Sequence, residues 1–230
     1  NATNTEVASI DFRMSIFPLE SPYLFGGFLD AYSYLLKGNV FANAQTGNAV
    51  LLFISLANRD PSKCIKYIIP IITFAFGILL SHLFKSAQKC TDYQRLKLIL
   101  LIEAILLLII SFFGSYLSNY LVNCVITLIA AIQVANFDKL DNHPIATTMI
   151  TGNLKSSMIH LANYIVTKNK ECLHSFLKYL LVIISFGIGV LTGSIAISLL
   201  STYSILFCEV MIIIPFILIS IEEKESSTST

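Results

Sequence analysis

Residues 98–113 read LILLIEAILLLIISFF, a run in which Glu103 is the only charged residue. Its length approaches the roughly 20 apolar residues that an α-helix needs to cross a bilayer. Residues 176–200 and 205–221 form two further runs, each with a single charged residue. Over the whole chain 13% of residues are charged, against about 25% in ordinary soluble domains. The sequence therefore predicts an integral membrane protein.

Apolar stretches along the chain predict eight helical elements. They cover residues 22–36, 46–57, 67–84, 96–117, 120–137, 151–166, 176–200 and 203–221. The second stretch has only 12 residues, or about 18 Å of helix, which is too short to span a bilayer alone. Polar breaks at residues 37–45 and 138–150 precede the second and sixth elements.

Three landmarks recur in the same order in two parts of the chain. Thr46-Gly47-Asn48 is repeated 105 residues later as Thr151-Gly152-Asn153. Residues 67–77 align without gaps on residues 179–189, and Glu103 has a counterpart in Glu209. Each aligned segment ends at a glycine that is followed four residues later by another small residue, giving the pairs Gly77/Ser81 and Gly189/Gly193. This spacing is typical of close helix packing. The chain is therefore predicted to consist of two related membrane halves.

The predicted fold is an all-α transmembrane bundle of two inverted repeats. If each short element completes or folds back beside the preceding helix, each half makes three net crossings, with a broken or re-entrant first helix. The predicted halves cover residues 22–117 and 118–221, between an N-terminal segment (1–21) and a disordered, acidic, Ser/Thr-rich tail (222–230).

The distribution of basic residues gives this topology an orientation. Residues 1–21, 85–97 and 167–178 and the tail would share one face with nine Lys and Arg residues, against three on the other face. Short cytoplasmic loops of membrane proteins are enriched in Lys and Arg. The sequence therefore predicts a multi-pass plasma-membrane protein with both termini in the cytoplasm.

The two Thr-Gly-Asn motifs have two interpretations. Thr, Gly and Asn are favourable N-cap residues, so each motif could simply start a short helix. Inside a membrane, however, paired interrupted helices indicate a binding site, and free helix N-termini favour anionic or carbonyl-bearing ligands. Thr46, Gly47, Asn48, Thr151, Gly152 and Asn153 are therefore candidate substrate-binding residues, and both interpretations stay open.

Further candidates are polar residues inside apolar runs. Glu103 and Glu209 are candidate proton-coupling residues, because carboxyl groups within a span are costly and usually face the bundle interior. The alternative is a protonated acid that only bonds to a neighbouring helix. Asp30 and Gln133 occupy related stretches before the two breaks and are candidate substrate contacts, one supplying a charge and the other hydrogen bonds.

The stretches around both motifs resemble one known family. Residues 27–31, Val40-Phe41 and Thr46-Gly47-Asn48 resemble the signature of the bacterial YoaK family, and residues 133–137 and 146–155 resemble its second motif. The resemblance implies a small polytopic membrane protein. It implies no activity, since the function of that family is unknown. Lys155 stands where the family commonly has Arg, and a lysine lacks the bidentate geometry of a guanidinium.

The favoured function is a small secondary transporter or permease for a small polar solute, anionic or zwitterionic, with proton coupling as an option. A non-transporting assembly or regulatory subunit is the alternative. An enzyme is the least favoured class, because the sequence contains no recognisable nucleophile–base pair or phosphate-binding loop. Expected partners are membrane lipid and the solute, with homo-oligomerisation left open. We expect no cofactor, no metal site and no nucleic-acid partner.

Overall fold

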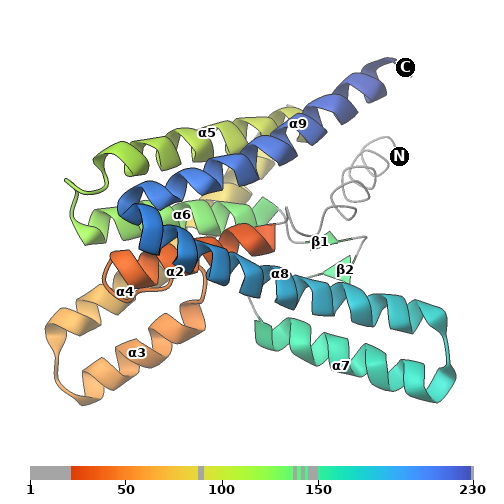
Figure 1. Cartoon of the computed structure of the whole chain (residues 1–230), viewed down its shortest axis with the longest axis horizontal. Coiled ribbons are helices and arrows are strands. Elements are labelled where there is room, and N and C mark those ends of the chain that lie inside the picture. Colours follow the sequence, from red (N-terminus) through yellow and green to blue (C-terminus); the bar gives the residue numbers. More distant parts are fainter. Residues whose placement is uncertain (1–21, 88–90, 137–138, 141–142, 145–149, 229–230) are drawn as a thin grey trace.

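The structure is a computed structural model that describes residues 22–87, 91–136, 139–140, 143–144 and 150–228. Within these ranges the regular elements are helices apart from one pair of two-residue strands (Figure 1). The elements are α2 (Pro22–Leu36), α3 (Gln45–Ala57), α4 (Pro61–Ala87), α5 (Asp92–Phe113), α6 (Asn119–Asn136), β1 (Lys139–Leu140), β2 (His143–Pro144), α7 (Ile150–Thr167), α8 (Lys170–Leu200), the 3-10 helix η2 (Ser201–Leu206) and α9 (Phe207–Thr228).

The long apolar helices predicted from the sequence are present. By length and composition, four stretches of the described chain could cross a membrane: Pro61–Ser86, Tyr93–Phe113, Asn119–Asn136 and Lys170–Ile221. The last of these covers α8, η2 and most of α9. Apart from the two short strands, the prediction of a helical bundle with helices long and apolar enough to span a membrane is confirmed for the described residues.

The structure also corrects several predicted boundaries. Helices α4 and α8 begin six residues earlier than predicted, at Pro61 and Lys170. Pro61 suits the first helical position, and Asn169 caps α8 by accepting a hydrogen bond from the backbone of Glu171 at 2.9 Å. The predicted last helix instead begins as η2, after Ser201 adopts a positive φ of 50°.

The prediction of a disordered tail is wrong for residues 222–228, because α9 continues to Thr228. The extension contains Glu and Lys, which are good helix formers. It is also tied to the bundle by an ion pair between Glu223 and Lys97 of α5. Residues 229–230 and the predicted N-terminal segment lie outside the described residues.

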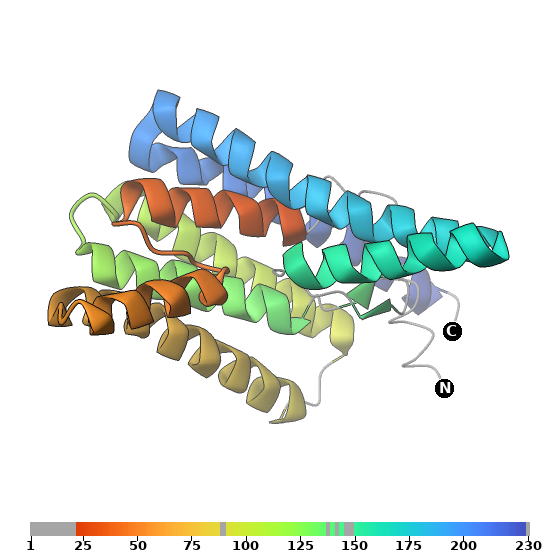
Figure 2. The same ribbon diagram turned by 90° about the horizontal axis from the view of Figure 1, so that it is seen from below.

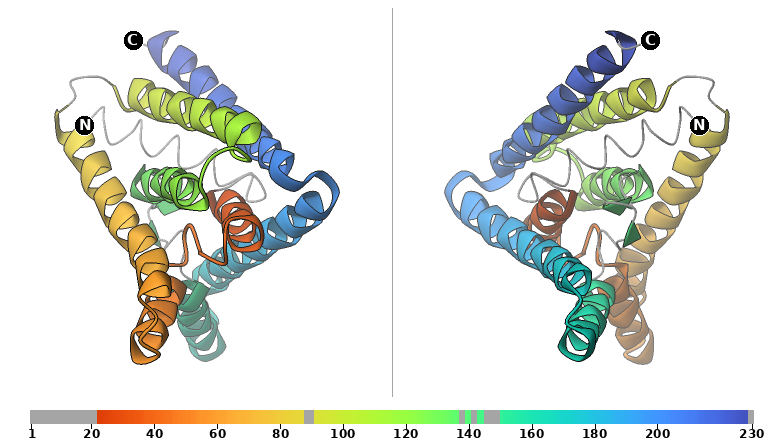
Figure 3. Two further views of the ribbon diagram at one scale, coloured as in Figure 1. Left: turned by 90° about the vertical axis from the view of Figure 1, so that its left-hand side faces the viewer. Right: turned by 90° about the vertical axis from the view of Figure 1, so that its right-hand side faces the viewer.

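Two central helices, α2 and α6, organise the bundle. Helix α2 packs along α8, and α6 packs along α4, while α3 and α7 form antiparallel hairpins with α4 and α8. Helix α5 crosses α9 on the other side of the central pair (Figure 3). The major contacts correspond in pairs. The α2–α8 contact corresponds to the α6–α4 contact, and the α3–α4 hairpin corresponds to the α7–α8 hairpin. The α5–α9 contact joins two corresponding helices. Seen from below, the α3–α4 and α7–α8 hairpins extend toward opposite ends of the bundle (Figure 2).

Small residues permit both central contacts. A Cβ atom built on Gly189 would lie 2.0 Å from the backbone oxygen of Leu24, so α2 and α8 touch through their main chains. On the related side, a Cβ on Gly77 would lie 2.6 Å from the Cβ of Ala131, and Asn136 donates to the Ser81 hydroxyl at 2.7 Å. The small-residue pairs thus lie inside the bundle, in the role that the sequence pattern predicted.

The apolar core lies between α2, α5, α6, η2 and α9. Among its fully buried members are Phe28, Leu29, Tyr32, Leu100, Leu107, Ile126, Ile129 and Ile205. The outer faces of α4, α5 and α8 instead expose large apolar side chains such as Ile72, Leu101 and Leu191. Such outward apolar faces suit contact with lipid tails, which are as apolar as the core itself.

We predict that Gly189→Ala destabilises the protein while Gly187→Ala does not. The added methyl group of the first variant would overlap the Leu24 main chain, which should cost about 3 kcal/mol or more. Gly187, two residues away, has no atom within 4 Å of its built Cβ, so alanine there should gain up to about 1 kcal/mol of helix propensity. Unfolding of the detergent-purified proteins measures both effects, and equal stabilities would contradict the close α2–α8 contact.

Candidate functional site

The segment between α2 and α3 turns back along α2. Gly38 and Asn39 both have positive φ values, 98° and 60°, and the Asn39 amide bonds to the Tyr34 carbonyl at 2.9 Å. This left-handed ending is typical of helix C-termini and is least costly at glycine. It reverses the chain, so that residues 40–44 come to lie against the polar side chains of α2.

Polar residues of α2 bind the backbone of the returning segment. The Asn43 amide donates to Oδ1 of Asp30 at 2.7 Å, and the Ala42 amide donates to the hydroxyl of Ser33 at 3.1 Å. The Asn43 side chain donates in turn to the Gly26 carbonyl at 3.0 Å. Asp30, Ser33 and Asn43 are all less than 5% exposed. These bonds satisfy non-helical main chain that would otherwise be buried without partners.

Asn48 holds the same segment from the other side. Its Oδ1 accepts from the Phe41 amide at 3.0 Å, and its Nδ2 donates to the Phe41 carbonyl at 2.7 Å and to Oε1 of Gln45 at 2.9 Å. The side chain is fully buried. Both amide protons of Asn48 are therefore used within the protein.

The first motif is not an N-cap. Helix α3 is preceded by Ala44, which makes no side-chain capping bond, so Thr46, Gly47 and Asn48 lie in the first turn. Thr46 is exposed. Gly47 lies under the Phe41 ring, whose Cδ2 would be 2.9 Å from a Cβ at that position. For the first motif, the structure replaces the capping interpretation with one in which Asn48 and Gly47 shape the preceding segment.

Asp30 also changes the electrostatics expected at the first motif. Its carboxylate binds the main chain one residue before Ala44, beside the amino end of α3. A helix N-terminus carries partial positive charge and attracts anions. At the amino end of α3, the place of an anionic ligand is therefore taken by the carboxyl group of Asp30.

The second motif likewise has an exposed threonine and a buried asparagine, but its glycine is exposed whereas Gly47 is half-buried. Thr151 and Gly152 are exposed, and Asn153, in the first turn of α7, is 3% exposed. Residues 145–149, which precede α7, lie outside the described residues. Gln133, the predicted counterpart of Asp30, is directed elsewhere, because its Nε2 donates to Oε2 of Glu103.

Glu103 is the most deeply buried acid in the described part of the chain. It lies midway along α5 with 0% exposure, on the same helix face as Leu100 and Leu107. Gln133 of α6 binds one carboxylate oxygen, and the other, Oε1, has no hydrogen-bond partner among the described residues. The structure thus brings two predicted site residues together and leaves one oxygen of Glu103 open.

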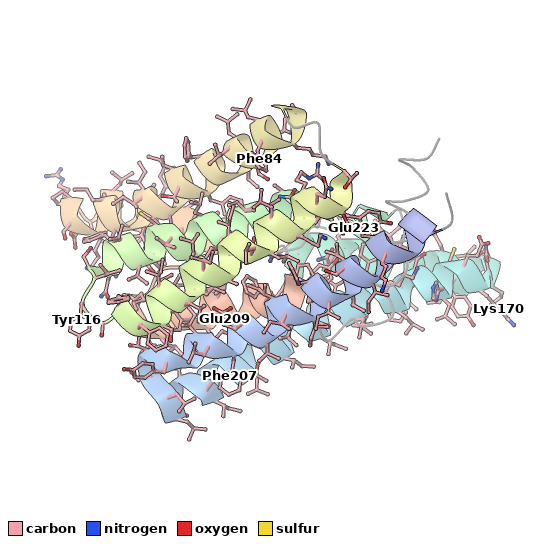
Figure 4. The ribbon with its side chains drawn as sticks, turned by 90° about the horizontal axis from the view of Figure 1, so that it is seen from above. Phe84, Tyr116, Lys170, Phe207, Glu209 and Glu223 are labelled. Carbon is pink, nitrogen blue, oxygen red and sulfur yellow. The ribbon has the colours of Figure 1, made fainter. Side chains whose placement is uncertain are left out.

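Glu209 differs from Glu103 in its surroundings. It lies in the first turn of α9 near Phe207 and is only partly buried (Figure 4). The buried face of η2 and α9 is formed by Ile205, Cys208 and Ile212. These residues follow Leu100, Glu103 and Leu107, respectively, by 105 positions. By burial, the counterpart of Glu103 is therefore Cys208. Glu209 lies one residue further, about 100° around the helix.

The sequence analysis missed a second polar network, at the end of α2. Lys37 is 5% exposed, and its Nζ donates to the carbonyl of Gly114, which ends α5, at 2.8 Å. Asn123 of α6 donates to the Lys37 carbonyl at 2.7 Å. A lysine near a helix C-terminus is a recognised favourable pairing, but the sequence alone did not show that α5 ends beside it.

These features define a small polytopic membrane protein with a polar, acid-containing interior. The chain belongs to the DUF1275 family, described as a protein of unknown function, which matches residues 22–218. It is similar to the UPF0700 transmembrane protein YoaK of Bacillus subtilis (strain 168), with 24% identity over 179 residues, covering 75% of this chain and 80% of the relative. No solved structure matches the chain. The predicted resemblance to the YoaK family is confirmed.

We predict that Asn48→Ala destabilises the protein more than Thr46→Ala. The first change removes three hydrogen bonds that hold residues 41 and 45, a loss of about 2 kcal/mol or more. The second removes an exposed side chain and should change stability by no more than about 0.5 kcal/mol. Thermal unfolding in detergent gives the comparison. Unchanged stability together with lost ligand binding would instead make Asn48 a direct ligand contact.

Proposed function

We propose that this protein is a secondary transporter for a small polar solute and that Glu103 couples transport to protons. The observation that carries the proposal is the buried carboxyl group of Glu103, which has one oxygen held by Gln133 and the other open. Acids within membrane spans are costly and commonly belong to ion pathways or proton relays. Asp30 also has one oxygen, Oδ2, without a partner among the described residues, but its other oxygen binds main chain, whereas the bound oxygen of Glu103 is held by the side chain of Gln133.

The proposed architecture is the inverted repeat. Its support is the correspondence of the α2–α8 contact with the α6–α4 contact, and of the α3–α4 hairpin with the α7–α8 hairpin. The nine-to-three distribution of basic residues supports the proposed orientation, with both termini cytoplasmic in the plasma membrane. In transporters built this way, two halves rock around a central site.

The solute is proposed to be anionic or zwitterionic. In the first half Asp30 already faces the amino end of α3. The second half has Gln133 in place of that acid, and Gln133 binds Glu103. The amino end of α7 therefore has no counterpart of Asp30 at the related position of α6, which favours recognition of an anionic group there.

The second candidate function is a non-transporting assembly or regulatory subunit. This function would be favoured if small residues formed an exposed helix face on which a helix of another protein could pack closely. Gly77, Gly189 and Gly193 instead pack against α6 and α2 within the chain. Those small residues therefore support the transporter proposal over the subunit proposal.

We predict that Glu103→Gln removes proton coupling, because glutamine keeps the shape of the side chain but cannot titrate at this position. A thermal-shift screen of the purified protein against small metabolites would first identify a stabilising solute. Uptake of that solute into proteoliposomes should then rise with an imposed proton gradient in the unchanged protein but not in the variant. Glu171→Gln, which changes an exposed acid at the start of α8, is the control and should keep its response. An unaltered gradient response in Glu103→Gln would remove Glu103 from the mechanism.

We also predict that cysteines at Ser62 and Lys170 label from opposite sides of the membrane. Ser62 lies in the first turn of α4, beside the α3–α4 turn, and is exposed. Lys170, at the start of α8, is also exposed (Figure 4). The experiment uses a membrane-impermeant maleimide on intact cells, in a variant whose five native cysteines are replaced. The Ser62 site should react from outside, and the Lys170 site only after lysis. Labelling of both sites from one side would refute the inverted topology.

A further inference from the structure

Five buried polar atoms lie on neighbouring elements without a hydrogen-bond partner among the described residues. They are Oε1 of Glu103, Oγ of Ser111, Oδ1 of Asn123, Oγ1 of Thr127 and Oγ of Ser204. Each residue is at most 5% exposed. They come from α5, α6 and η2, and α5 contacts both of the other elements.

Four of these residues are spaced along α5 and α6 between an end of the bundle and its middle. Helix α5 ends and α6 begins at the turn 114–118, near which Ser111 and Asn123 lie. Thr127 is one turn deeper on α6. Glu103 is eight residues before Ser111, or about 12 Å deeper along α5. These four residues are thus distributed between the α5–α6 turn and Glu103, and Ser204 lies on η2, which packs against α5.

Asn123 shows how the outer end of this set of residues is arranged. Its Nδ2 is used by the Lys37 carbonyl at 2.7 Å, whereas its Oδ1 remains open as an acceptor. Lys37 in turn binds the Gly114 carbonyl at the end of α5. The outer end therefore lies where α2, α5 and α6 are joined by hydrogen bonds.

Unpaired polar groups of this kind are expensive in a protein interior. A buried hydroxyl or amide oxygen without a partner costs about 1–3 kcal/mol, and buried water commonly supplies the missing bonds. Five such groups on neighbouring elements would add up to a large penalty if the interior were dry. Glu103 has the same requirement in either state, because Gln133 donates to Oε2 and a proton on Oε1 would need an acceptor.

We propose that Ser111, Asn123, Thr127 and Ser204 line a hydrated track through which Glu103 exchanges its proton with the α5–α6 end of the bundle. The proton leaves Oε1 of Glu103 for a water molecule, and further waters pass it to solvent. The carboxylate that remains keeps its hydrogen bond from Gln133, and reprotonation follows the reverse route. The inference rests on the proposed role of Glu103 and names the side from which that residue is reached.

In the proposed orientation, the α5–α6 turn lies on the face opposite the termini. The track would therefore connect Glu103 with the extracytoplasmic side. Protons entering there would be those that drive uptake of a solute into the cell.

Infrared spectroscopy of the purified protein tests the track directly. The carboxylic-acid band of Glu103 is identified at acidic pH as the band that Glu103→Gln removes, and its shift is followed after transfer into deuterated buffer. Thr127→Val, which keeps the shape but removes the hydroxyl, should slow the shift about tenfold or more, the change expected when a hydrogen bond worth about 1.4 kcal/mol is lost from the path.

Two further variants make the result specific. Thr192→Val removes an exposed hydroxyl on α8 that bonds to its own helix at 2.8 Å, and it should exchange like the unchanged protein. Thr127→Ser keeps the hydroxyl, and its Glu103 band should shift at the rate of the unchanged protein. This variant keeps the test informative if Thr127→Val impairs folding. A missing Glu103 band, or equal rates in Thr127→Val and the unchanged protein, would overturn the proposal. The measurement uses no solute or gradient, so failure to transport and failure of the track give separate results.

Discussion

A returning segment of main chain inside a membrane bundle needs hydrogen bonds that lipid does not supply, and meeting this requirement shapes the first half of the protein. Asp30, Ser33 and Asn48 bind the amides and carbonyl of residues 41–43 from two sides. Without these bonds, the segment after α2 could not turn back against it. The start of α3, the position of Phe41 over Gly47 and the polar character of the interior all depend on them.

The helices themselves could be predicted from the sequence, because long apolar runs and polar breaks report directly on burial in a membrane. Residues 22–36 match α2 at both ends, and the break after them contains the returning segment. The role of Asn48 could not be predicted, since helix capping and binding to the segment before the helix use the same side-chain groups. The sequence also did not show which residues of the last helix face the core. The similarity of Glu103 and Glu209 suggested a pair, whereas the buried face of α9 places Cys208 at the matching position.

The two proposed repeats have corresponding helix contacts but different polar residues at the related position. In the first half a carboxyl group, Asp30, is occupied by the protein's own main chain, and in the second an amide, Gln133, is free to hold the acid Glu103. The polar position on α2 therefore stabilises the returning main chain. The related position on α6 instead holds the carboxyl group of Glu103 on α5.

The main-chain contact between Gly189 and Leu24 has a consequence for biosynthesis. Helix α2 finds its chief packing partner in α8, and Leu24 and Gly189 are 165 residues apart. At about 5–20 residues per second, the ribosome needs roughly 8–30 s to make the intervening chain. During that interval α2 has left the ribosome without the surface that it finally covers. Neither half can complete its central contact alone, so the bundle can close only once nearly the whole polypeptide has been made.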